Sequence, residues 1–199
     1  MPRGKRNQDP LSKIYEKALD LFVTYGYSST STASIAKACG MSQGNLFHYC
    51  RSKENLLYQI HMRDLQTRFI PILEEAEKVS DPDARITLFL RKFTLMVTSS
   101  KVGQVFIHEV RSLSRSHQEE ILAIWKRGYD LMRGAIEELQ MTRRARNGRE
   151  SFLTFLGIGM AFWTIYWWDY SRQTNSEEFA ETLIRVFREG LLSSGNGGE

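Results

Sequence analysis

Polar, aromatic and basic side chains crowd one short stretch of the chain, residues 30–54, which reads TSTASIAKACGMSQGNLFHYCRSKE. Two short helical patterns flank Gly40 in this stretch, and the second carries little bulk on its outer face. A helix that enters the major groove of DNA needs a slim tip and hydrogen-bonding groups that reach base edges and phosphates. The stretch therefore predicts a helix-turn-helix unit that contacts double-stranded DNA.

The second helix of this unit, residues 43–49, carries the side chains that we expect to contact bases. The amide of Gln43 can pair bidentately with adenine, and the ring of Phe47 can contact a thymine methyl group. Gly44 and Asn45 keep the tip slim, so that the backbone can approach the bases.

Hydroxyl and basic side chains around the two helices are candidates for contacts with the strand backbone. Hydroxyls at a helix start can cap free amides and also donate to phosphate oxygens, and the amides themselves favour an anion. For one of the three hydroxyl side chains at residues 30–32, the alternative is that it only caps the helix and does not contact DNA. The expected backbone contacts are Thr30, Ser31, Thr32, Ser42, His48, Tyr49, Arg51 and Lys53.

The positive charge of the chain is concentrated at its start. Residues 1–55 hold eight Lys and Arg against four Asp and Glu, whereas the remaining residues hold nineteen of each sign. This asymmetry favours a polyanion partner for the first quarter alone. Arg3, Lys5 and Arg6 on a flexible leader can enter a minor groove, and a solvated tail is the alternative.

The order of these features resembles the TetR family of bacterial transcriptional regulators. An amphipathic helix precedes GYSSTS, then IAKACGMSQGNLFHYCRSKENLL, and an all-helical remainder follows. The resemblance covers residues 11–57 closely and the rest by helix count and chain length. Phe47 departs from the family's usual Tyr, which removes a phenolic contact to phosphate. Cys50 stands where an aromatic residue usually packs.

The resemblance implies a cytoplasmic, ligand-responsive regulator, a repressor that is released from DNA by a small apolar effector. It also implies a homodimer formed through the last two of nine helices, on a palindromic operator with half-sites about one helical turn apart. For the dimer surface, Gly157 and Gly159 permit close helix approach. The last helix carries an apolar stripe of Phe179, Leu183 and Phe187, which we expect at the dimer surface. The alternative is that this stripe belongs to the core of a single subunit.

The apolar periodicity predicts an all-α fold, because residues recur at three- and four-residue steps and no alternating strand pattern occurs. About nine helices are expected, as an N-terminal three-helix helix-turn-helix DNA-binding domain and a six-helix ligand-binding and dimerisation domain. We place the first domain, with its basic arm, at residues 1–52 and the second at 53–193. Residues 194–199 are expected to be a disordered tail.

Caps and breakers indicate where helices begin and end. Asp9-Pro10 and Asp81-Pro82 are typical helix starts, Gly26 is a left-handed stop, and Pro71 should kink or end its helix. A capping box is expected at Ser116–Glu119 and a cap at Ser176. The expected helices include residues 32–39, 43–49, 102–113 and 150–170. Another is expected to run from the capping box to residue 139.

The second domain is rich in aromatic residues, which suit a cavity for a large apolar ligand as well as an ordinary core. The expected ligand-binding residues are Phe89, Phe93, Phe106, Glu109, Trp125, Tyr129, Phe155, Trp163 and Trp167.

Two later stretches suggest an effector class. IHEVRSLSRSHQEEI and FLGIGMAFWTIYWWDYSRQTNSEEFAETLIRVFREGL look like the subgroup that controls fatty-acid and steroid catabolism and responds to acyl-CoA thioesters. That similarity gives a use to Arg143, Arg144, Arg146 and Arg149, although a solvated basic loop is the alternative. A family member that controls an efflux gene and responds to aromatic or cationic drugs is the alternative function.

Other classes have little support in the chain. Residues 151–168 carry no charge and just reach the length of a membrane span, but a buried helix fits better. No HxxxH or CxxC occurs, so neither a metal nor another cofactor is expected. No nucleophile–base pair supports an enzyme, because Glu109 and His108 are neighbours that point apart on a helix. Cys50 is expected to be a small buried hydrophobic residue, with a redox pair formed by Cys39 and Cys50 as the alternative.

Overall fold

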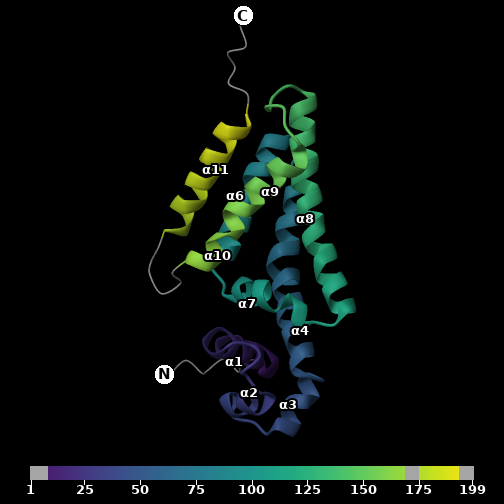
Figure 1. Cartoon of the computed structure of the whole chain (residues 1–199), viewed down its shortest axis with the longest axis vertical. Helices are drawn as coiled ribbons and strands as arrows, with labels where there is room; N and C mark the ends of the chain where they lie inside the picture. Colours follow the sequence, from purple (N-terminus) through teal and green to yellow (C-terminus); the bar gives the residue numbers. More distant parts are fainter. Residues whose placement is uncertain (1–8, 169–174, 193–199) are drawn as a thin grey trace, which may run out of the picture.

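The computed structural model describes residues 9–168 and 175–192, and nearly all of them are helical (Figure 1). Apart from one isolated bridge between Ala145 and Leu192, these residues form no β-structure. The elements are α1 (Pro10–Tyr25), α2 (Thr32–Cys39), α3 (Gln43–Tyr49), α4 (Lys53–Asp64), the π turn η1 (Leu65–Phe69), α5 (Ile70–Ala76), α6 (Pro82–Thr98), α7 (Val102–Glu109), the 3₁₀ turn η2 (Val110–Ser112), α8 (Arg115–Met141), α9 (Glu150–Phe162), α10 (Thr164–Trp167) and α11 (Ser176–Leu191). The predicted all-α fold is confirmed.

The first three helices form a small head at one end of the molecule (Figure 1). Local signals define their limits: Asp9 caps α1, Ser31 and Ser34 form a capping box on α2, and Ser42 caps α3. Gly40 adopts the left-handed conformation (φ 72°) that the sharp turn between α2 and α3 requires. The buried contacts between the helices come from Ile14, Ala18, Phe22, Ile35 and Leu46.

A long helical rod runs from the head into the body as α4, η1 and α5 (Figure 1). Pro71 was expected to kink or end this rod, but the helix continues to Ala76. In the π turn just before the proline, the backbone hydrogen bonds span five residues in place of four, and the Ile70 amide donates to the Leu65 carbonyl. Such a turn re-routes hydrogen bonds at the point where proline lacks a donor.

Four other predicted helix limits differ from the structure. Ser114 caps α8 in place of Ser116, and Asn175 caps α11 in place of Ser176, because their side chains accept from His117 N and Glu178 N. The helix expected at 150–170 stops at Phe162 and resumes as the short α10, while Tyr170 lies outside the described residues. The helix expected to reach residue 113 ends at Glu109 and tightens into η2.

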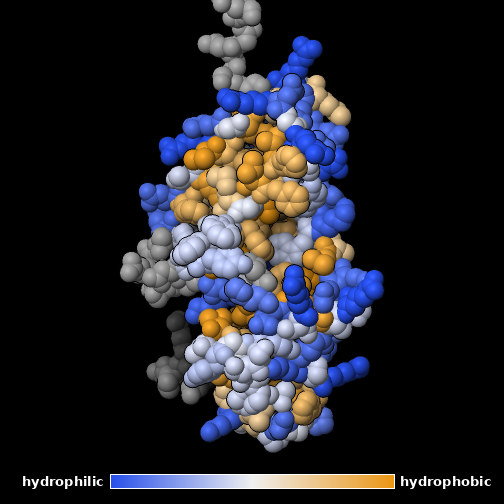
Figure 2. All heavy atoms as spheres, viewed as in Figure 1, coloured by the Kyte–Doolittle hydropathy of each residue, from blue (hydrophilic) through white to orange (hydrophobic). Residues whose placement is uncertain are grey.

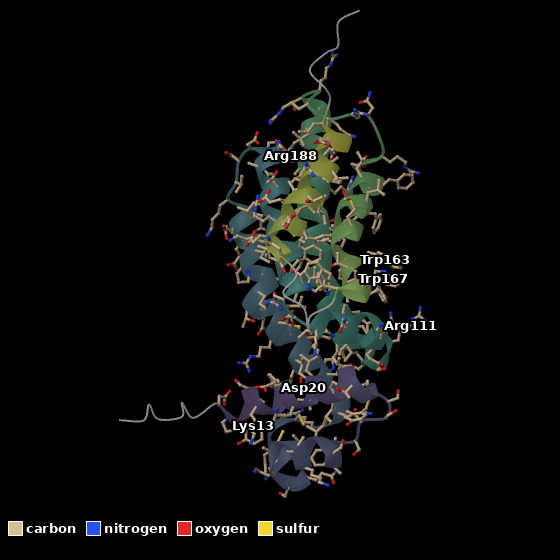
Figure 3. The ribbon with its side chains drawn as sticks, turned by 90° about the vertical axis from the view of Figure 1, so that its left-hand side faces the viewer. Lys13, Asp20, Arg111, Trp163, Trp167 and Arg188 are labelled. Atoms are coloured by element: carbon tan, nitrogen blue, oxygen red, sulfur yellow. The ribbon has the colours of Figure 1, made fainter. Side chains whose placement is uncertain are left out.

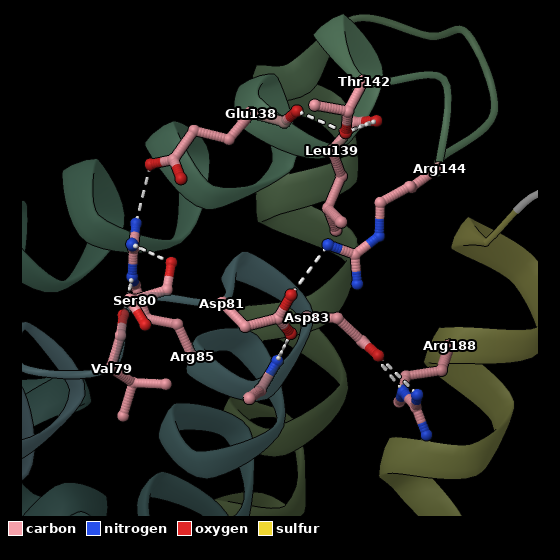
Figure 4. A network of polar contacts seen from close by, with 11 residues as sticks. Val79, Ser80, Asp81, Asp83, Arg85, Glu138, Leu139, Thr142, Arg144 and Arg188 are labelled. Carbon is pink, nitrogen blue, oxygen red and sulfur yellow. Dashed lines mark hydrogen bonds and ion pairs between the residues drawn. The ribbon is translucent and has the colours of Figure 1, made fainter.

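The body surrounds α6, which packs against α5, α8, α9 and α11. Phe69, Phe89 and Phe93 are buried at its centre. At the end far from the head, ion pairs join α6 to its neighbours (Figure 4). Asp83 pairs with Arg188 Nε at 2.8 Å, Asp81 with Arg144 Nη1 at 2.7 Å, and Arg85 Nη1 with Glu138 at 2.7 Å. None of the described helices has both the length and the apolar character of a membrane span.

Candidate DNA-contacting surface and effector cavity

The outer face of α3 is exposed at the tip of the head. Its exposed residues are Gln43, Gly44, Asn45, Phe47 and His48, while Leu46 is fully buried and anchors the helix. Gln43 Nε2 donates to Thr32 Oγ1 at 2.7 Å, so the starts of α2 and α3 lie side by side. The helix starts that sequence reasoning assigned to bases and phosphates are therefore brought together on one surface.

The four predicted hydroxyl residues differ in their surroundings. Ser31 and Ser42 are exposed caps, and Thr32 is partly buried at the start of α2. Thr30 is buried, and its hydroxyl donates to the Gly26 carbonyl at 2.8 Å. The expectation of a phosphate contact from the Thr30 side chain is therefore wrong, because this hydroxyl closes the loop after α1.

Lys53 lies at the start of α4, and its ammonium group already has hydrogen-bond partners. Its Nζ donates to the carbonyls of Tyr27 at 2.8 Å and Thr30 at 2.9 Å, and it lies 4.3 Å from the centre of the Tyr27 ring. Lys53 thus fastens the rod to the head, and any phosphate contact must share this ammonium group. Tyr49 is partly buried and Arg51 is exposed, whereas Arg3, Lys5 and Arg6 lie outside the described residues.

The two cysteines are buried in the head, as was predicted for Cys50. Burial raises the pKa of both thiols above the ordinary value. A reactive thiolate needs the opposite shift. The structure therefore opposes a redox pair formed by Cys39 and Cys50.

The body contains an apolar cavity of about 710 Å³ between α8, α9 and the core aromatics, which opens to the surface at Phe155 and Leu122. This volume is within the range of small-molecule sites. Gly128 borders it closely, since a Cβ there would lie 2.7 Å from the Phe69 ring. The lining residues are Phe69, Phe89, Phe93, Phe106, Leu122, Trp125, Lys126, Gly128, Tyr129, Phe155, Ile158, Gly159 and Phe162.

Six of the nine predicted ligand-binding residues line this cavity, namely Phe89, Phe93, Phe106, Trp125, Tyr129 and Phe155. The other three, Glu109, Trp163 and Trp167, do not line it. Glu109 borders a different groove of about 340 Å³ between α1, α7 and α10. Trp163 and Trp167 project from the body surface (Figure 3), where both side chains are exposed.

Sequence reasoning missed several lining residues. Phe69, Ile158 and Gly128 sit in apolar helical patterns that look like ordinary core, and only the packing of η1 against α8 places them around a space. The signal that could have found Phe69 is Pro71, since a proline two residues later requires an altered helical turn.

The basic loop after α8 lies away from the cavity. Arg144 pairs with Asp81, and Arg149 lies 4.9 Å from the centre of the Phe152 ring. Neither these residues nor Arg143 and Arg146 are among those that line the cavity. Lys126, on α8, is the cation in the lining.

A second contact joins the rod to the body next to the head. Glu54, on α4, accepts from the Ser114 amide at 2.8 Å and from His117 Nδ1 at 2.7 Å, and Tyr58 stacks on the His117 ring. Burial alone would raise the pKa of Glu54, but these hydrogen bonds outweigh it and hold the pKa below its ordinary value. We call Glu54, Tyr58, Ser114 and His117 the α4–α8 clasp.

An apolar patch covers the outer face of α9 and α11 (Figure 2). Its exposed members are Phe152, Phe155, Leu156 and Val186. Leu183 and Phe187 were expected on this face but are buried inside the subunit, where a Cβ on Gly157 would lie 2.9 Å from the Phe187 ring. The core-stripe alternative is therefore correct for Leu183 and Phe187. Phe179 packs on Trp168, and Gly159 has open space around it.

Comparison with known proteins agrees with this arrangement of head, rod and hollow body. Residues 14–60 match the family model for bacterial regulatory proteins of the tetR family, and residues 79–191 match that for the tetracyclin repressor-like C-terminal domain. The chain belongs to the TetR family. TetR regulators bind operator DNA as dimers and respond to small ligands.

Individual TetR regulators are similar over most of this chain. It is 22% identical to the fatty acid metabolism regulator protein of Bacillus subtilis (strain 168) over 67% of its length and 70% of the relative's. AibR in complex with isovaleryl coenzyme A and operator DNA has a TM-score of 0.81 and 25% identity, covering 89% of this chain and 97% of AibR. PfmR from Thermus thermophilus has a TM-score of 0.82 at 24% identity, covering 90% of this chain and 99% of PfmR.

Proposed function

We propose that this protein is a ligand-controlled transcriptional repressor that binds a palindromic operator as a homodimer and leaves it when a small apolar effector enters the body. The observation that carries the proposal is one continuous rod, α4–η1–α5, which ends at the DNA-contacting head and contributes Phe69 to the wall of the cavity. In this proposal residues 1–52 bind DNA, and residues 53–193 bind the effector and the second subunit.

The head supplies base and backbone contacts in this proposal. Gln43 and Phe47 face bases, and the flanking polar residues of α2 and α3 face phosphates. A single helix-turn-helix buries too little surface for tight binding, so two heads must act together. The exposed apolar patch of α9 and α11 is the surface through which we pair the two subunits.

The rod converts effector binding into a change at the head. Lys53 ties the rod to the loop at Tyr27 and Thr30, and the α4–α8 clasp ties it to the body. An effector lowers operator affinity only if it prefers the conformation in which the two heads are wrongly spaced. A ligand that displaces Phe69 shifts the rod directly, and both ties transmit that shift.

The effector class follows from the lining. The cavity walls carry Lys126 as their charged residue and no carboxylate among the described lining residues, which favours an uncharged apolar body over a cationic drug. An acyl-CoA thioester is a candidate because AibR, a structural neighbour, is known in complex with isovaleryl coenzyme A. In that case the acyl chain enters the cavity and the nucleotide stays outside, near Lys126.

Selection of binding sites from random duplexes tests the proposal. The purified protein should enrich a palindrome with half-sites about one helical turn apart, and Gln43→Ala should lose base preference within each half-site. Native mass spectrometry of the same protein should show a dimer that carries a co-purified apolar ligand. A monomer, or the absence of any enriched sequence, would refute the proposal. A cationic co-purified ligand would favour the drug-responsive alternative.

A further inference from the structure

A second, much smaller cavity lies behind the aromatic wall of the first. Its volume is about 20 Å³, enough for one water molecule or one terminal ligand atom. Phe106, Trp125 and Phe162 line both cavities, so these three rings form the partition between them. The small cavity is otherwise lined by Ser100 and by residues of α4, η1, α6, α7 and α10.

His61 places an unpaired nitrogen at this small cavity. The side chain is 4% exposed, its ring stands edge-on to Phe106 at 4.1 Å between ring centres, and its Nε2 has no hydrogen-bond partner. Burial lowers the pKa of His61 to about 3, so the imidazole is neutral at pH 7. A buried polar atom without a partner is costly and calls for an explanation, such as a ligand group that completes the hydrogen bond.

The charged groups at the small cavity already have partners. Arg68 Nη1 donates to Asp64 at 3.0 Å, and Arg68 Nη2 donates to Ser99 Oγ at 2.6 Å. Ser100, which also lines this cavity, accepts from the Val102 amide at 3.2 Å, whereas His61 Nε2 has no partner and is therefore the group that we assign to a ligand atom. Among the described residues, the other buried unpaired side-chain atom is Thr94 Oγ1, and Thr94 lines neither cavity.

The position of His61 on the rod connects this contact to the head. It lies on α4, one turn before the π turn whose residues Leu65 and Arg68 line the small cavity and whose Phe69 lines the large one. π turns inside α-helices are frequent at functional sites. A ligand that spans the partition thus contacts the rod on both sides of its irregular turn.

We propose that the effector is an elongated apolar molecule with one uncharged oxygen, a hydroxyl or a carbonyl, and that His61 Nε2 hydrogen-bonds this oxygen behind the Phe106–Trp125–Phe162 partition. The inference rests on the proposed role of the large cavity as the effector site. The apolar body of the effector fills the large cavity, and the oxygen takes the small one. A carboxylate is disfavoured there, because the neutral ring cannot balance its charge and the Arg68 guanidinium at the same cavity is already paired with Asp64.

The test uses two probes that differ by one hydroxyl group, 4-phenylphenol and biphenyl, titrated calorimetrically into the full-length protein at pH 7. The native protein should bind 4-phenylphenol about tenfold more tightly than biphenyl, as expected for one buried hydrogen bond. His61→Phe should remove this preference without weakening biphenyl. Thr94→Val is the matched control, since it removes the other unpaired buried atom and should keep the tenfold ratio. Melting temperatures confirm that both variants fold.

A second measurement needs no variant. In native protein with ¹⁵N-labelled histidine, the His61 Nε2 resonance should shift with 4-phenylphenol and stay in place with biphenyl. Equal affinities of the native protein for the two probes, a preference that survives in His61→Phe, or an unmoved resonance would each overturn the proposal in favour of a bound water at His61. Failure of both probes to bind would overturn it as well. Site selection with the same preparation reports separately on the repressor function.

Discussion

The head and the body use the same element, an amphipathic helix, in opposite ways. The head is small and tightly packed, and its polar residues lie outside, where Gln43, Asn45 and His48 meet solvent. The body is larger, and its aromatic residues line a space of about 710 Å³ that opens to the surface. The comparison teaches that a contact surface for DNA is built from exposed local features, whereas a ligand site requires helices from distant parts of the sequence.

The largest expected effect separates the two regions by unfolding one of them. Leu46→Ala removes a fully buried anchor of the head and should destabilise the head by about 2–5 kcal/mol. Operator binding should be lost, while 4-phenylphenol still binds the body. Hydrogen exchange resolved by segment checks this, with fast exchange expected in α1–α3 alone. Equally fast exchange in α6 would show that head and body unfold as one unit.

Charge placed on the apolar patch should break the pairing of two bodies. Leu156→Glu, at a side chain that is 62% exposed, should weaken dimerisation by about 2–4 kcal/mol, because two charges would be buried across the two-fold axis. Sedimentation velocity measures the dimer. Met141→Glu is the control on α8, at an exposed apolar side chain that lines neither cavity. Loss of the dimer in the control variant alone would show that the dimer interface lies on α8.

A change at the tip of the head should alter which DNA is bound. Gln43→Ala should cost about 1–3 kcal/mol on the selected operator and little on unrelated DNA. Arg51→Ala should weaken both equally and reduce the salt dependence of binding, since an exposed cation contacts phosphates. Fluorescence anisotropy with both duplexes at several salt concentrations separates the two effects. Identical behaviour of the two variants would contradict the division of roles.

The smallest effect concerns the link between the regions. Glu54→Gln should cost about 1 kcal/mol of clasp stability and reduce the change in operator affinity that an effector causes. The native clasp should weaken in acid, because the pKa of Glu54 is lower in the folded protein than in the unfolded chain. The stabilisation by the Glu54 carboxylate is therefore fully present above the ordinary carboxyl pKa, and it is lost as the pH falls through the pKa of the folded state. Hydrogen exchange at the start of α8 between pH 3 and pH 7 measures this. No pH dependence in the native protein would show that the clasp does not depend on the carboxylate.

The difference between the two regions also explains which predictions succeeded. The limits of α1, α2 and α3 could be predicted from caps and glycines, because each signal acts within a few residues. The rod could not, since the π turn before Pro71 depends on how Leu65 and Phe69 pack in the body. The burial of Thr30 and the carbonyl partners of Lys53 were missed for the same reason, because both side chains bond to carbonyls of the loop that follows α1.

The amino-acid sequence by itself determined the helical class, the helix-turn-helix and its exposed tip, and the aromatic richness of the body, because periodicity, capping and composition are local properties. Tertiary structure alone decided which aromatics surround a space, that Leu183 and Phe187 point inward while Phe152 and Leu156 point outward, and that His61 keeps an unpaired nitrogen. Those outcomes depend on how the neighbouring helices share volume around α6, and no single segment of the chain carries that information.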